Sequence, residues 1–207
     1  MPAFSTEIVP EQNLGGAMSF ASLEIIEEAS QTFAFGTPVS INSSDGGVQA
    51  WSGSSYTNAI AGISQVAANN LGTTGASAPQ GFTPVLGPAS VVGSYAANAN
   101  QPLALIMPPG VPFTNGRIPF FVAGPGTVFS AVLGNAGSAA ATSNAYVGTA
   151  GYGLTKDPVN AYWYVDISKT GASAVVSITQ LDPRFPVGTV GGKVWFTFLP
   201  AAIQVLG

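Results

Sequence analysis

The chain has no cysteine and no histidine among its 207 residues. Without cysteine it forms neither disulfides nor a reactive thiolate, and the usual structural zinc sites lose their thiolate and imidazole ligands. Histidine is the commonest acid–base group near neutral pH, so the familiar nucleophile–base pairs of hydrolases are excluded too. We therefore expect no catalytic residues, no metal site and no cofactor.

Charged residues are scarce as well. Asp, Glu, Lys and Arg make up 7% of the sequence, against about 25% in an average soluble domain. None of the 71 residues between Asp45 and Arg117 is charged, yet 46% of the chain is hydrophobic. This combination suggests that other subunits cover much of the surface. The five basic residues are scattered singly, which leaves no basic stripe for a nucleic-acid backbone.

Long hydrophobic runs are also missing. No apolar run approaches the roughly 18 residues that a membrane span needs, and the first residues lack the basic and apolar regions of a signal peptide. We therefore expect a protein made and folded in a cytoplasm, with neither a membrane nor nucleic acid as a partner.

Glycine and proline are abundant, with 26 and 16 residues. They interrupt helices and mark turns. From Phe33 onward apolar runs alternate with turn residues, and Asn42–Gly47 indicates a hairpin turn. The clearest strands are expected at 162–166, 174–181 and 193–199. Because no crossover helices separate these runs, we predict an all-β fold, an antiparallel β-sandwich or barrel with long loops rich in Gly, Ala and Ser.

The first 32 residues differ from the rest, since they hold five of the nine acidic residues. Leu23 and Ile26 are spaced like one face of a helix, so a short helix over 19–29 and an extended N-terminal arm both fit. We assign 1–32 to an arm, irregular or in part helical, and 33–207 to a β-rich domain. A division of that domain into two subdomains near 100–125 is an option.

Three aspartates are the remaining candidates for chemistry. To serve as a glycosidase pair, two of Asp157, Asp166 and Asp182 would have to converge within about 5–10 Å. A proline follows both Asp157 and Asp182, and this pairing is more typical of the start of a turn. The hairpin turn at Asn42–Gly47 contains one acidic residue, too little charge for a calcium loop.

Aromatic residues mark two further surfaces. Tyr162 and Tyr164 share one face of their strand, where they pack in a core or interface or stack on a sugar. Trp195 lies on the strand face opposite to Phe196 and Phe198. A strand with two apolar faces must be covered on both, by a second sheet or by a neighbouring subunit.

The order of several short segments is informative. These segments are Phe35–Val39, Val48–Gly53, Ile60–Ile63, Pro112–Ile118, Tyr152–Asp157, Trp163–Asp166, Leu181–Pro183 and Gly192–Ala201. Across residues 33–207 this order resembles the head decoration, or cement, proteins of tailed bacteriophages. No single segment is diagnostic, because each is also an ordinary turn followed by a strand.

The resemblance implies a structural virion protein on the outer surface of an icosahedral capsid, made in the host cytoplasm. Its partners would be the major capsid protein and itself, as a homotrimer, and it would stabilise contacts between capsid subunits. It carries no catalytic residues to transfer. The candidate interface residues are Leu23, Ile26, Phe33, Phe113, Arg117, Tyr162, Tyr164 and Trp195.

A head-fibre or adhesion-type module that binds glycans is the alternative function. A solvent-exposed, coplanar Tyr162/Tyr164 pair would favour it, whereas burial of this pair at an interface would favour capsid decoration. A hydrolase that uses two aspartates is the third hypothesis, and it requires the convergence described above.

Overall fold

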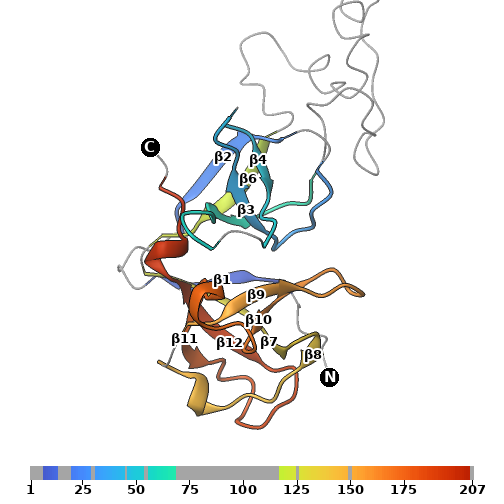
Figure 1. Cartoon of the computed structure of the whole chain (residues 1–207), viewed down its shortest axis with the longest axis vertical. Coiled ribbons are helices and arrows are strands. Elements are labelled where there is room, and N and C mark those ends of the chain that lie inside the picture. Colours follow the sequence, from blue (N-terminus) through green and yellow to red (C-terminus); the bar gives the residue numbers. More distant parts are fainter. Residues whose placement is uncertain are drawn as a thin grey trace, which may run out of the picture.

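The computed structural model describes residues 7–13, 20–28, 31–44, 46–53, 56–68, 117–124, 126–148 and 151–205. These residues form strands and short 3₁₀ turns, and none of them belongs to an α-helix. They build two lobes, each around one sheet, and the C-terminal segment runs from the larger lobe up along the smaller one (Figure 1). Phe113 lies outside the described residues.

The larger sheet has seven strands. They are β1 Val9–Asn13, β7 Thr127–Asn135, β8 Ser138–Ala139, β9 Gly153–Lys156, β10 Trp163–Asp166, β11 Val176–Leu181 and β12 Lys193–Phe198. Their order is β11-β12-β7-β10-β9, with β1 and β8 also paired to β7. All pairs are antiparallel except β10 with β7. A bridge from Tyr152 to Val176 connects the two ends of this order.

The smaller sheet has five strands. They are β2 Ser22–Ile26, β3 Pro38–Ile41, β4 Val48–Ala50, β5 Gly62–Ser64 and β6 Arg117–Val122. The order is β2-β6-β5-β3-β4, and every pair is antiparallel. A parallel bridge between Glu27 and Val48 joins the chain after β2 to β4. The 3₁₀ turns are η1 Asn144–Tyr146, η2 Gly171–Ser173 and η3 Pro200–Ala202.

The predicted all-β fold with mainly antiparallel pairing is confirmed. The alternative of a short helix over 19–29 is wrong, because Ser22–Ile26 pairs along its whole length with β6. Two stretches of the expected arm are strands, since Val9–Asn13 forms β1 in the larger sheet and Ser22–Ile26 forms β2 in the smaller one. The spacing of Leu23 and Ile26 fits helix and strand alike, and long-range pairing with β6 decides between them.

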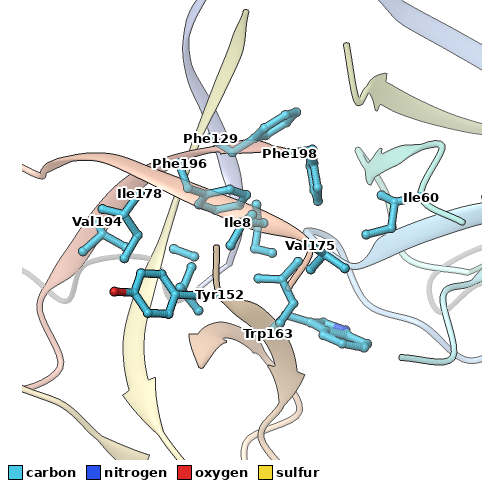
Figure 2. Packing of buried hydrophobic residues seen from close by; sticks show 14 of the residues in the cluster. Ile8, Ile60, Phe129, Tyr152, Trp163, Val175, Ile178, Val194, Phe196 and Phe198 are labelled. Atoms are coloured by element: carbon cyan, nitrogen blue, oxygen red, sulfur yellow. The ribbon is translucent and has the colours of Figure 1, made fainter. Parts of the chain in front are cut away.

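The main core lies inside the larger lobe. The side chains of Phe129, Phe196 and Phe198 gather there beside Ile8 (Figure 2). The ring centroids of Phe129 and Phe198 are 5.5 Å apart, as are those of Phe196 and Phe198. Alternate residues of β12 point inward, as the period of a strand requires. Ile8 has no exposed surface, so the residue before β1 is part of this core.

The two lobes share buried contacts. Trp51 of the smaller lobe packs on Trp163 of the larger lobe, with ring centroids 5.4 Å apart. Ile60 and Ile63 also belong to the main core. A second core inside the smaller lobe consists of Phe33, Val39, Val48, Ala61, Ile118 and Phe120. Strands β2 to β6 form the smaller sheet and β7 to β12 the larger one, which also takes up β1 from the start of the chain.

Replacement of Phe196 by alanine tests the main core. Phe196 is fully buried and touches two other phenylalanine rings, so Phe196→Ala should lower the free energy of unfolding by about 3–5 kcal/mol. Urea unfolding followed by tryptophan fluorescence measures this loss. The control, Val187→Ala at a side chain that is 61% exposed, should stay within about 0.5 kcal/mol of the parent. Equal effects of the two variants would contradict the assignment of the core.

Candidate functional site

Exposed apolar side chains occur on both lobes. They are Leu23, Phe35, Val66, Val159, Val187, Val190 and Val205. Leu23 lies in β2, Phe35 comes before β3 and Val66 follows β5, while Val187 and Val190 belong to the loop between β11 and β12. Single exposed apolar residues are ordinary on soluble proteins. Whether these side chains mark a contact surface depends on how few charged residues surround them.

Strand β2 lies at one end of the smaller sheet, and the bridge from Glu27 to Val48 follows directly after it. In the described part of the chain, Ser22–Ile26 pairs with β6 on one side and with no strand on the other. Its residues Ser22, Leu23 and Glu24 are all exposed. An unpaired strand edge is a template for a strand of another chain.

The predicted interface residues fall into different environments. Leu23 is exposed, but Phe33 is only 4% exposed and lies in the second core. Trp195 is half-buried on β12. The backbone places Ile26 at the end of β2 and Arg117 at the start of β6. Of the residues whose side chains the structure describes, Leu23 is the one that fits a surface contact best.

Tyr162 and Tyr164 do not form a flat platform. Their ring centroids are 6.4 Å apart and the ring planes meet at 65°. Tyr164 is 3% exposed, and its hydroxyl accepts a hydrogen bond of 2.9 Å from the Gly137 backbone N–H. Burial raises the pKa of both phenols. Tyr164 is thus buried by its own chain, which is the core packing that the sequence offered as one alternative, while Tyr162 is half-buried.

Asp157 starts a turn, as its sequence context predicts. Its Oδ1 accepts backbone hydrogen bonds from Val159 at 2.8 Å and Asn160 at 2.7 Å. The bonds from Asn160 and Val159 hold the pKa of Asp157 below its usual range. This carboxylate is therefore ionised at neutral pH and fixes local backbone.

Asp166 has a similar structural use inside the larger lobe. It is 2% exposed, and it accepts hydrogen bonds from Ser168, Thr155 and the Ala136 backbone. Burial raises its pKa, but these hydrogen bonds outweigh burial and hold the pKa below the usual range. A general acid needs a raised pKa instead.

The third aspartate, Asp182, belongs to a charged cluster that attaches β1 to the loop after β11. We call Glu11, Asp182 and Arg184 the β1 clamp. Arg184 Nε donates to both carboxylate oxygens of Asp182, at 2.8 and 3.1 Å, and its Nη2 donates to Glu11 Oε1 at 3.1 Å. Glu11 Oε1 also accepts a hydrogen bond of 2.7 Å from the Ser130 hydroxyl on β7.

The Asp182 side chain is fully buried, whereas that of Arg184 is 48% exposed. Burial raises the pKa of Asp182, but the hydrogen bonds and charge of Arg184 outweigh it and hold the pKa below the usual range. The Trp195 indole nitrogen lies beside this carboxylate but makes no hydrogen bond to the described part of the chain. Asp182 is therefore ionised and committed to Arg184.

Lys193 holds the chain just before β1. It is 4% exposed, and its Nζ donates to the Glu7 carbonyl at 3.3 Å. Burial lowers the pKa of Lys193, against the opposing effect of the Glu11 carboxylate. The sequence indicated the turn at Asp182 but gave no sign of Glu11, which lies 173 residues from Arg184. Only the pairing of β1 with β7 brings the two together.

The described residues lack both a metal-binding cluster and a membrane-spanning helix. They contain no group of three or more Asp or Glu side chains arranged to hold a metal ion. They also contain no helix long and apolar enough to cross a membrane. No protein-family model matches the sequence, and neither a curated protein nor a solved structure does. The resemblance to decoration proteins therefore rests on the order of segments alone.

Removal of Arg184 tests the β1 clamp. Arg184→Ala should lower the free energy of unfolding at pH 7 by about 1–3 kcal/mol, because the buried Asp182 carboxylate loses its charged donor. The folded-state pKa of Asp182 lies below its unfolded value. Its contribution is therefore present above the unfolded pKa, about 4, and is lost as the pH falls through the folded pKa.

Urea unfolding between pH 7 and pH values below about 4 measures this effect. The difference between parent and Arg184→Ala should shrink toward the acid end. Lys156→Ala removes an exposed cation on β9 and serves as the control, with little change at any pH. A loss that is independent of pH, or equal in both variants, would rule out the clamp.

Proposed function

We propose that this chain is a structural virion protein of a tailed bacteriophage. It binds the outer surface of the icosahedral capsid, as a homotrimer, and stabilises contacts between major capsid protein subunits. The resemblance over residues 33–207 supplies this identity. Two features of the described surface support it: its very low charge and its open strand edge.

The burial of the few charges carries the proposal. Glu27, Asp166, Asp182 and Lys193 are each at most 5% exposed. With charged residues at 7% of the sequence and these four buried, few charged side chains remain on the described surface. Transfer of a neutral surface into a large contact costs little desolvation. Such a surface suits a protein that spends its life covered by neighbours.

Strand β2 supplies a place for such a contact. A stable interface buries about 800 Å² on each partner, and an added strand combines backbone hydrogen bonds with side-chain contacts. Leu23, 40% exposed at this edge, would add apolar area worth about 25 cal/mol per Å² buried. Repeated around a shell, modest contacts of this kind add up through multivalency.

The glycan-binding alternative loses its expected site. It required Tyr162 and Tyr164 to present coplanar, exposed rings, but the rings are inclined by 65° and Tyr164 is buried. The hydrolase hypothesis is also weakened, since Asp157, Asp166 and Asp182 each accept several hydrogen bonds from their own surroundings. Capsid decoration is therefore the function we put forward.

The molar ratio of this chain to the major capsid protein in purified particles tests the proposal. Quantitative mass spectrometry should find a ratio near one, or a simple fraction fixed by the lattice. A few copies per particle would indicate a fibre or adhesin instead, and absence from particles would refute a virion role.

Occupancy of the particle should depend on Leu23. Leu23→Asp places a charge at the exposed β2 edge and removes apolar contact, so occupancy at limiting protein should fall about tenfold or more. Unfolding free energy should stay within about 0.5 kcal/mol of the parent. The matched control is Val187→Asp, which adds the same charge on the larger lobe. If Leu23→Asp decorates particles as well as the parent does, β2 is not the docking edge.

A further inference from the structure

A polar hollow of about 320 Å³ lies on the smaller lobe. Its walls are the hairpin formed by β3 and β4, the segment around Asn58, and the C-terminal segment at Gln204. Strands β3 and β4 lie in the upper lobe of Figure 1, and the red C-terminal segment runs up along its side. The volume is at the lower end of the range of about 300–1,000 Å³ that is usual for small-molecule sites.

The chemistry of the hollow is neutral and rich in hydrogen-bonding groups. Ser40 and Gln49 stand opposite each other in the β3–β4 register, so their side chains share one face of the hairpin. Val39 and Val48, next to them in the sequence, point into the second core. None of the described residues that line the hollow is charged, and amides and hydroxyls dominate its walls.

The walls are held rigidly. The Gln204 side chain makes two hydrogen bonds of 2.8 Å to the backbone of Ile41, one as acceptor and one as donor. The Asn42 amide donates to Glu28 at 3.1 Å and accepts from the Ser44 backbone at 2.9 Å. The backbone of Asn58 donates to the Ala201 carbonyl at 2.7 Å. A prearranged wall loses little freedom when a ligand binds.

Other groups in the hollow are available to a ligand. The side chains of Gln49 and Asn58 make no hydrogen bond to the described part of the chain, although both face the hollow. Each amide offers two donors and an acceptor. Trp51 also lines the hollow but is only 2% exposed. It offers an edge and no open ring face, so hydrogen bonds must dominate recognition there.

We propose that this hollow is a binding site for a neutral sugar, with the Gln49 and Asn58 amides as its principal contacts. A sugar hydroxyl both donates and accepts, which matches amide and hydroxyl walls. An anionic sugar would lack a cationic partner, and a flat heterocycle would lack a ring to stack on. The proposal does not rest on the capsid-binding function, because none of the described residues that line the hollow belongs to β2.

Titration of the full-length protein with methyl glycosides tests this site. The probes are the methyl glycosides of glucose, galactose, N-acetylglucosamine and rhamnose, with N-acetylneuraminic acid as the anionic comparison. Saturation-transfer NMR should show saturable binding of at least one neutral glycoside, with a Kd of about 1 mM or tighter. The anionic sugar should bind at least tenfold more weakly.

Two variants locate the site. Gln49→Ala and Asn58→Gly should each weaken binding of the neutral glycoside about tenfold, since each removes hydrogen bonds to it. Glycine suits position 58 because the φ of Asn58 is +48°. Gln180→Ala, which removes an exposed amide on β11, should leave binding unchanged. Failure of all four neutral glycosides to bind, or binding that survives both variants, would overturn the proposal.

Discussion

Strand β7 needs cover on both faces and along both edges, and much of the fold follows from this need. Of its nine residues, only Asn135 is exposed. Phe129 and Leu133 point into the main core, while Ser130 and Val132 face the other way and are buried too. Strands β12 and β8 pair with β7 along one of its edges. Strands β10 and β1 pair with it along the other.

The role of β1 follows from β7. Without β1, the first half of β7 would leave the backbone of Val128 and Ser130 unpaired on one side, which is costly for buried peptide groups. The β1 clamp holds Glu11 of this strand, and Lys193 holds the Glu7 carbonyl just before it. Acidic residues that mark the N-terminal segment as distinct by composition are thus used inside the fold. Glu11 forms its ion pair with Arg184 of the same chain.

The sequence predicts local features well and long-range ones poorly. Strands at 162–166, 174–181 and 193–199 correspond to β10, β11 and β12. Burial alternates along parts of β11 and β12, whereas β10 is a short, mostly apolar run buried on both faces. Asn42–Gly47 closes a turn, with the Gly46 N–H donating to the Asn42 carbonyl at 2.8 Å. By contrast, the pairing of β1 with β7 and of β2 with β6 spans roughly a hundred residues, and no local pattern records it.

The same distinction applies to the candidate sites. Tyr162 and Tyr164 share a strand face as predicted. However, the Gly137 backbone N–H on the neighbouring turn donates a hydrogen bond to the Tyr164 hydroxyl, which is therefore not available at the surface. The clamp and the polar hollow depend on residues brought together by strand pairing and by the C-terminal segment. Sequence patterns name the residues available for a surface, and only the topology decides which of them reach it.

The scarcity of charge then limits how the protein can find its partners. Charged patches accelerate association by steering, and this chain has little surface charge with which to steer. Its contacts must instead come from area, unpaired backbone and repetition on a lattice, where a second contact forms at high effective concentration. Burying Asp166, Asp182 and Lys193 serves the fold by fixing loops and β1, and it also leaves a surface that costs little to desolvate. The burial of these few charges thereby stabilises the fold and also lowers the desolvation cost of surface contacts.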